Sequence, residues 1–191
     1  MVIKKRKVVR CELNEISIFS FLNKYFGSSK FTEYDIFIFA IDAVFSLPIG
    51  VQEIPAHTVP EDYKSNPFLF RFTEQFVKEN TGNQCLSMIK DNIGSQATKS
   101  MFFLKHFGFN QKEIGVWETA DKKATAIEVY PKLAFGYDPT QKSDIYDAEK
   151  CCEIAKKFAN ERNAFFAPED CLKIMEDTIK KEGWIWFPKQ N

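Results

Sequence analysis

The segment "YDIFIFAI", residues 34–41, most constrains how this chain folds. It is apolar at both alternating positions, which is typical of a strand covered on both faces in the middle of a sheet. We therefore expect it to be the central strand. Asp42 follows it directly, and a carboxylate in such surroundings is costly unless hydrogen bonds, a cation or a proton compensate it. The sequence therefore singles out Asp42 as a residue that needs a partner.

The rest of the chain predicts helices and strands around this segment. We expect a short strand at 4–13, an irregular connection at 50–67, a second buried strand at 124–131 and a closing strand or packed extension at 183–188. The predicted helices cover residues 14–26, 70–81, 85–107, 144–162 and 168–181. This alternation predicts an α/β fold with helices on both faces of one sheet. The length of 191 residues favours a single domain spanning 1–191.

Charge and cysteine content narrow the classes of function. The 26 basic and 26 acidic side chains cancel, so a site for a polyanion has to be local. The five cysteines include no CxxC pair, which indicates reduced thiols and a cytoplasmic location. The sequence has no apolar run of about 18 residues, so we expect no membrane partner. With two histidines, a zinc cluster has no support, so a bound metal is expected to be Mg²⁺ or Mn²⁺ held by oxygen ligands.

Three carboxylates are candidate ligands for such metals. Asp42 follows the central strand, Glu128 lies in the strand "ATAIEVYP", and Asp147 lies in the first turn of the helix that follows Ser143. Strand alternation places Glu128 on the face opposite Ile127. Two-metal hydrolysis of phosphate esters needs several carboxylates that converge on the cations. The alternatives are structural: Asp42 caps a turn, Glu128 pairs with a buried arginine such as Arg71, and Asp147 favours a helix N-terminus.

The predicted helix at 144–162, which contains Asp147, has an apolar stripe. The position of Asp147 relative to this stripe predicts where its carboxylate lies. Helical spacing predicts that the stripe contains Ile145, Ala148, Cys152, Ala155 and Ala159. Asp147 then borders the core without pointing into it.

Arg71 and Glu74 form a second candidate pair within "FRFTEQ". The planar guanidinium of Arg71 suits bidentate binding of a phosphate or a carboxylate. The alternative is an ion pair between the two residues, which are three positions apart on one helix face.

Five segments resemble motifs of one known family, and they occur in the family's order over residues 36–188. "AIDAVFSLPIG" resembles "IDxPLxxP", "FRFTEQ" resembles "FRxTD", "IEVYPKLAFG" resembles "EvYPaa", "YDAEKCC" resembles "DAxxCA", and "EGWIWFP" resembles the closing motif of the domain of unknown function 429 family. That family is regarded as predicted nucleases of ribonuclease H-like fold. The resemblance implies a ribonuclease H-like mixed sheet with helices on both faces. It implies Asp42 and Asp147 as ligands of Mg²⁺ or Mn²⁺, and it matches Glu128, Arg71 and Glu74 to motif positions.

The function that follows is metal-dependent hydrolysis of phosphodiesters, with nucleic acid as the expected partner. Asp42, Glu128 and Asp147 would hold the cations, and Arg71 would position the phosphate. Family members usually open with a "GIDxxxxGW" strand, whose aspartate is the expected central metal ligand. This chain shows no such segment before Lys4, so the sequence predicts an N-terminally shortened domain, an inactive descendant, or a fragment of a longer enzyme. The rival function is a non-catalytic interaction domain that uses an exposed sheet edge and aromatic surface, for example as a homodimer.

Overall fold

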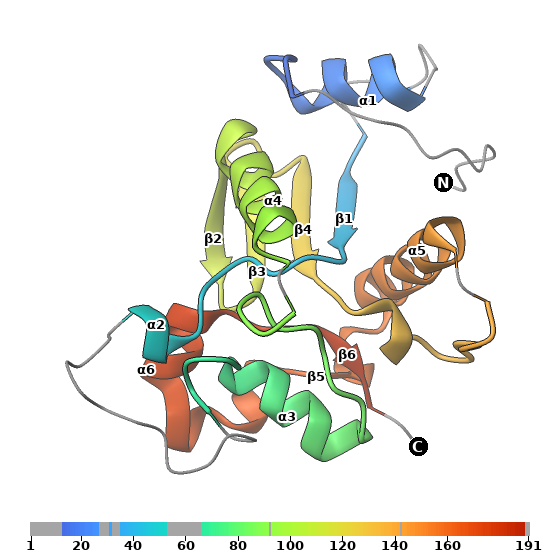
Figure 1. Cartoon of the computed structure of the whole chain (residues 1–191). Helices are drawn as coiled ribbons and strands as arrows, with labels where there is room; N and C mark the ends of the chain where they lie inside the picture. Colours follow the sequence, from blue (N-terminus) through green and yellow to red (C-terminus); the bar gives the residue numbers. More distant parts are fainter. Residues whose placement is uncertain are drawn as a thin grey trace.

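The computed structural model describes residues 13–26, 31, 35–52, 66–91, 93–141 and 143–189, which fold into a mixed α/β structure (Figure 1). The strands of the main sheet are β1 (Phe37–Ile41), β2 (Phe109–Glu113), β3 (Val116–Thr119) and β4 (Ala124–Glu128). The helices are α1 (Ile18–Phe26), α2 (Ile49–Gln52), α3 (Phe72–Thr81), α4 (Gly94–His106), α5 (Asp144–Asn160) and α6 (Leu172–Glu182). A second sheet pairs the two short strands β5 (Phe165–Phe166) and β6 (Phe187–Pro188).

The strands of the main sheet run in the order β1-β4-β3-β2. β1 and β4 are parallel, whereas β3 is antiparallel to both β4 and β2, so the sheet is mixed. The prediction that β1 is the central strand is wrong for the sheet that the described residues form, where β4 lies between β1 and β3. Burial agrees with this order, because all five residues of β1 are only partly buried while four of the five in β4 are fully buried.

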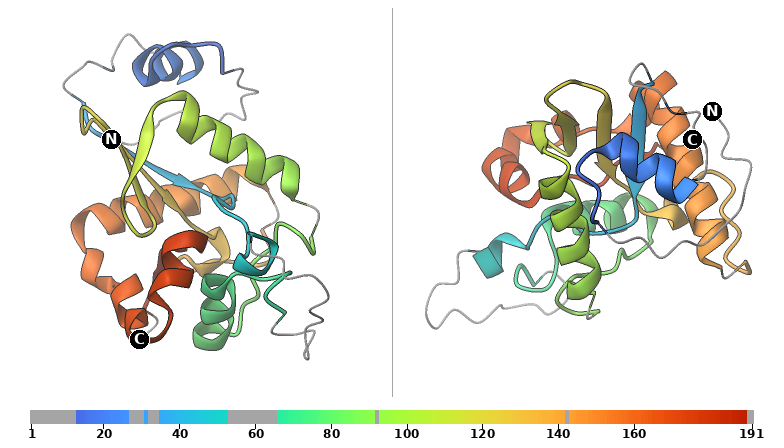
Figure 2. Two further views of the ribbon diagram at one scale, coloured as in Figure 1. Left: turned by 90° about the vertical axis from the view of Figure 1, so that its left-hand side faces the viewer. Right: turned by 90° about the horizontal axis from the view of Figure 1, so that it is seen from above.

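Helices cover both faces of the sheet, as the sequence predicts. α4 and α5 lie on opposite faces, and α2, α3 and α6 lie beyond the carboxyl ends of β1 and β4 (Figures 1 and 2). One core cluster joins α1 and α4 to Phe39, Ala124 and Ala126. The other joins α3, α5 and α6 to Ile127 and to the closing segment. Alternation along β4 therefore places Glu128 on the α4 side of the sheet.

The closing segment extends the sheet at the carboxyl end of β4. Ile185 forms a parallel bridge with Glu128, and the backbone N–H of Trp186 donates to the Glu128 carbonyl at 2.9 Å. β6 then pairs with β5. Both alternatives predicted for this segment are therefore partly confirmed, because it is a packed extension that ends in a short strand.

Several predicted boundaries change. The helix expected at 85–107 begins only at Gly94, and the helix expected from Pro168 starts as a 3₁₀ turn, with α6 following from Leu172. The hairpin of β2 and β3 lies in a stretch for which the sequence predicts no element. The strand expected at 4–13 lies outside the described residues, except for Leu13. No helix in the described ranges combines the length and the apolar character needed to cross a bilayer.

Candidate active site

Asp42 lies immediately beyond the last residue of β1. It lines a small hollow of about 60 Å³ together with Arg71, Cys85, Glu128 and Tyr130. The side-chain amide of Gln96 donates to the backbone carbonyl of Asp42 at 2.6 Å, which ties this turn to α4. Asp42 and Glu128 therefore meet at one hollow at the carboxyl ends of two parallel strands, where ligands of α/β sheets gather.

The Asp42 carboxylate lies in an environment that opposes its charge. Burial, followed by repulsion from Asp147 and Glu128, raises its pKa from 3.8 to about 6, while Lys132 acts in the opposite direction. Within the described ranges no donor forms a hydrogen bond with this carboxylate. No hydrogen-bond donor in the described part of the chain therefore offsets the cost of burying the Asp42 charge. A bound proton or a bound cation can offset it instead.

Asp147 is carried to the same region by the first turn of α5. Ser143 caps this helix, because its hydroxyl accepts from the backbone N–H of Tyr146 at 3.2 Å. The Tyr137 hydroxyl donates to Asp147 Oδ1 at 2.9 Å. Burial and this hydrogen bond raise the pKa of Tyr137 to about 12, so its hydroxyl keeps its proton and holds Asp147 in place.

The face of α5 that packs on the sheet differs from the predicted stripe. The buried residues are Cys151, Ile154, Ala155 and Phe158, while Ala148, Cys152 and Ala159 are exposed. Asp147 lies one turn before Cys151, on the same side of the helix as the buried residues. Burial raises the pKa of the Cys151 thiol, and the charges of Asp42 and Asp147 raise it further. Asp147 itself is partly buried, as expected for a residue that borders the core.

Glu128 forms a bidentate ion pair with Arg71. The guanidinium donates to both carboxylate oxygens, to Oε2 from Nη1 at 2.9 Å and to Oε1 from Nη2. The backbone N–H of Phe45 adds a third hydrogen bond, to Oε2 at 3.1 Å. These contacts match the structural alternative for Glu128 that the sequence left open.

Arg71 is the centre of a buried ionic network. It is 0% exposed and also donates from Nε to Glu74 Oε1 at 2.8 Å. Glu74 Oε2 accepts from the Arg71 backbone N–H at 3.1 Å, which closes the first turn of α3. Burial lowers the pKa of Arg71, but the carboxylates of Glu128 and Glu74 more than offset this, so the pKa is raised. Arg71 and Glu74 therefore hold the framework of the site.

Glu182 belongs to the same network, although the sequence did not single it out. Its carboxylate accepts from the backbone N–H groups of Ile49 and Phe72, and its carbonyl accepts from Arg71 Nη1 at 3.1 Å. A signal existed, because a glutamate in the last turn of a helix opposes the helix dipole and needs another reason to be there. That reason is the link between α2, α3 and α6.

The structure thus divides the five candidates into two groups. The charge of Asp147 raises the pKa of Asp42 at the end of β1, whereas Arg71 forms ion pairs with both Glu74 and Glu128. Among the described residues there is no group of three or more His, Cys, Asp or Glu side chains arranged to hold a metal ion. Two carboxylates are enough for Mg²⁺, which usually keeps several waters.

The comparisons with known proteins add no relative. No family model, no curated protein and no solved structure matches the chain. The class of site therefore has to be argued from the residues and the geometry.

Proposed function

We propose that Asp42 and Asp147 bind one Mg²⁺ or Mn²⁺ ion and that the chain is a metal-dependent phosphodiesterase of ribonuclease H-like type. The observation that carries the proposal is the partly buried Asp42 carboxylate beside Glu128, whose pKa is raised to about 6 by burial and by neighbouring carboxylates. A divalent cation relieves both the desolvation cost and the repulsion. The resemblance to the domain of unknown function 429 family agrees with this assignment, since it implies the same two aspartates.

The donor set of this pair fits a hard cation. Both side chains offer carboxylate oxygens, which Mg²⁺ and Mn²⁺ prefer. Tyr137 fixes the orientation of Asp147 through its hydrogen bond, and the link from Gln96 to the Asp42 carbonyl fixes the turn that carries Asp42. Such supporting contacts orient metal ligands in known sites.

The other candidates take supporting roles in this proposal. Glu128 raises the pKa of Asp42 through its charge and so strengthens the demand for a cation. Arg71 is enclosed by Glu74 and Glu128, so it holds the carboxyl end of β4 in place and leaves the positioning of a phosphate to other groups. When bound, the cation would stabilise charge on a phosphate and make a nearby water a better nucleophile.

Titration calorimetry with Mg²⁺ and Mn²⁺ tests the cation site directly. We expect binding to the unmodified chain, tighter at pH 8 than at pH 5 because Asp42 must lose its proton first. The Asp42→Asn and Asp147→Asn variants should each lose at least about tenfold in affinity, the low end of what the loss of a ligand's supporting contact costs. Asp177→Asn, which removes an exposed carboxylate of α6, is the matched control.

Incubation with single-stranded and duplex nucleic acids in the presence of Mn²⁺ tests the activity. Cleavage should depend on Mn²⁺ and should be absent from Asp42→Asn but present in Asp177→Asn. Equal background in the unmodified chain and in Asp42→Asn would reject the phosphodiesterase assignment. Cation binding without cleavage would keep the metal site and reject the activity.

A second candidate function is self-association through β1. Among the described residues β1 has a strand partner on one side only, namely β4. An apolar strand of this kind pairs readily with another strand. Light scattering on the purified chain tests this candidate.

We also propose a cytoplasmic location. Cys85, Cys151, Cys152 and Cys171 are free thiols, as in proteins of a reducing compartment. Labelling of thiols in intact cells checks this, and their protection as disulfides would contradict it.

A further inference from the structure

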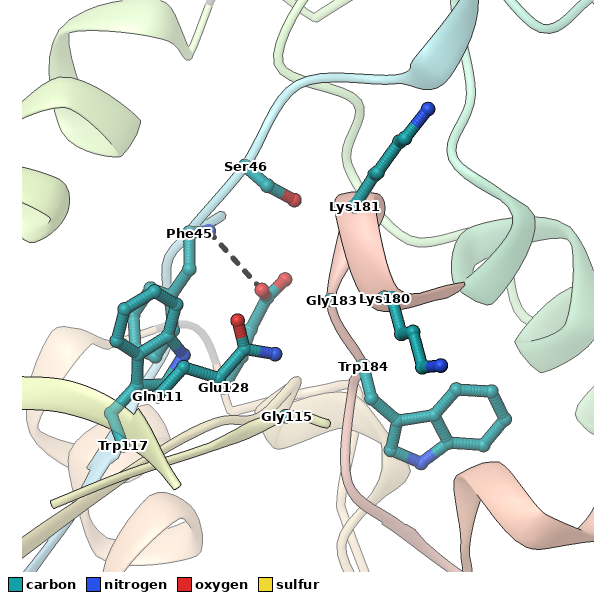
Figure 3. Close-up of a pocket in the computed structure, with 10 residues that line it drawn as sticks. All are labelled: Phe45, Ser46, Gln111, Gly115, Trp117, Glu128, Lys180, Lys181, Gly183 and Trp184. Carbon is teal, nitrogen blue, oxygen red and sulfur yellow. Dashed lines mark hydrogen bonds between the residues drawn. The ribbon is translucent and has the colours of Figure 1, made fainter. Parts of the chain in front are cut away.

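A second hollow, of about 200 Å³, lies on another side of Glu128. Figure 3 shows its two walls: Phe45, Trp117, Gln111 and Glu128 on one side, and the end of α6 with Lys180 and Trp184 on the other. None of the residues in this hollow belongs to the Asp42 and Asp147 pair. The proposed phosphodiesterase function therefore leaves this space unexplained.

The walls of this hollow are flat and aromatic. Trp117 is half-buried and packs edge to face on Phe45, with ring centroids 6.4 Å apart. Trp184 is 1% exposed, and its indole N–H donates to the Phe166 carbonyl at 3.0 Å, which fixes the ring. Rigid aromatic surfaces of this kind bind planar rings with little loss of side-chain freedom.

The floor of the hollow offers a hydrogen-bond acceptor. Glu128 is 3% exposed, and among the described residues its Oε1 accepts from Arg71 Nη2 alone. A carboxylate oxygen can accept two hydrogen bonds. One acceptor position on Oε1 is thus open to a donor group of a ligand, such as an amino group on a ring.

The rim carries positive charge. Lys180 and Lys181, in the last turn of α6, both line the hollow and are exposed. Lys180 pairs with Glu176 across one helical turn, at a site where both side chains are about half exposed. Exposed pairs of this kind are weak and exchange readily for a phosphate. The hollow thus combines flat walls, an acceptor floor and a cationic rim.

We propose that this hollow binds a nucleoside monophosphate whose base carries an exocyclic amino group. The base packs on the partly exposed Trp117 ring, its amino group donates to Glu128 Oε1, and its phosphate lies outside against Lys180 and Lys181. A space of about 200 Å³ corresponds to roughly seven waters at about 30 Å³ each. That is room for a single heterocycle but not for a whole nucleotide.

Tryptophan fluorescence tests the proposal, because two of the three tryptophans line the hollow. Titration is done in EDTA, so that the result does not depend on the cation site. Adenosine 5′-monophosphate should quench the emission in a saturable way. Purine riboside 5′-monophosphate, which lacks the amino group, should bind more weakly, and inorganic phosphate alone should cause no quenching.

The variant Lys180→Gln/Lys181→Gln probes the rim without touching the core. It should weaken binding of adenosine 5′-monophosphate by about five- to tenfold, as expected for two exposed charge contacts, and should leave binding of adenosine unchanged. Lys156→Gln, an exposed lysine of α5, is the control. Absence of saturable quenching, equal binding of the two purine monophosphates, or an equal effect of both lysine variants would overturn the proposal.

Discussion

Arg71 shows what a buried charge costs and how this chain compensates it. The guanidinium is 0% exposed, and the two carboxylates that enclose it, those of Glu74 and Glu128, are at most 3% exposed. Burying such ions costs several kcal/mol each, and the cost is recovered only when every donor and acceptor is paired. The network meets most of this demand, since Ser46 and the Glu182 carbonyl take further hydrogen bonds from Arg71 Nη1.

Replacement of Arg71 by methionine should therefore destabilise the fold strongly. We expect Arg71→Met to lower the free energy of unfolding at pH 7 by about 3 to 5 kcal/mol, because Glu74 and Glu128 are left buried without a counter-ion. Urea denaturation followed by circular dichroism measures this loss. Lys156→Met, at an exposed position, should change stability by less than about 0.5 kcal/mol. A loss below about 1 kcal/mol for Arg71→Met would contradict the role assigned to the network.

Asp42 should make the fold less stable above pH 6 when no cation is bound. Its pKa is raised from 3.8 to about 6 in the folded chain, so the folded state binds its proton more tightly than the unfolded state does. Stability from this group is complete below pH 3.8 and is lost as the pH rises through about 6. Asp42→Asn should thus raise the free energy of unfolding at pH 7.5 by about 2 kcal/mol in EDTA, with little change at pH 4.

Denaturation of both chains at the two pH values measures this difference. The Asp177→Asn variant serves again as the control, since Asp177 is exposed. An Asp42→Asn chain that is less stable than the unmodified chain at pH 7.5 in EDTA would show that the carboxylate has a structural partner.

At the scale of elements, the hairpin of β2 and β3 depends on Gly115. This residue has a φ of 74°, and a Cβ added there would lie 2.5 Å from the Cβ of Trp184. Gly115→Ala should therefore cost about 2 to 4 kcal/mol, from backbone strain together with overpacking. Gly108, which has a φ of 70° and no atom within 4 Å of an added Cβ, is the matched control and should cost about 1 to 2 kcal/mol as alanine. Equal losses in thermal unfolding would contradict the role of the Trp184 contact.

The ends of individual helices were predictable from the sequence where a capping residue or a glycine sets them. Ser143, a favourable N-cap residue, caps α5, and Gly82 and Gly183 end α3 and α6. The pairing of strands was not predictable in the same way. β4 is central because β3 and β1 flank it, and this depends on the hairpin "FNQKEIGVWET", whose β2 is polar and whose turn residue Gly115 is its main local signal.

The candidate site was predictable in part, for a related reason. Asp42 and Glu128 follow or end neighbouring strands, so their meeting at one hollow follows from the sheet. Helical spacing alone did not fix which face of α5 is buried: it predicted Cys152 in the apolar stripe, whereas Cys151 is the buried residue. The choice between Arg71 as a phosphate ligand and Arg71 as a buried ion depends on tertiary packing, which spacing does not report.

At the scale of the whole molecule, the two outer strands of the described sheet differ in character. In β2 four of five residues are exposed, and its charged residues Lys112 and Glu113 form ion pairs with Glu118 and Arg162. Charged side chains of this kind protect an edge from pairing. β1 carries the sequence "FIFAI" and no such charge, so among the described strands it is the edge that the proposed self-association would use.

Light scattering coupled to size-exclusion chromatography should show a dimer fraction that increases with protein concentration. Ile36, which precedes β1 and is 72% exposed, offers a place to oppose pairing without disturbing the core. We expect Ile36→Lys to shift the equilibrium to monomer, because a lysine at a sheet edge has to lose its hydration when a second strand pairs there. Ile16→Lys, at a residue that is 97% exposed and precedes α1, should leave the dimer fraction unchanged. A monomer at every concentration, or equal effects of the two lysines, would exclude β1 as an association edge and leave the phosphodiesterase proposal as the candidate function.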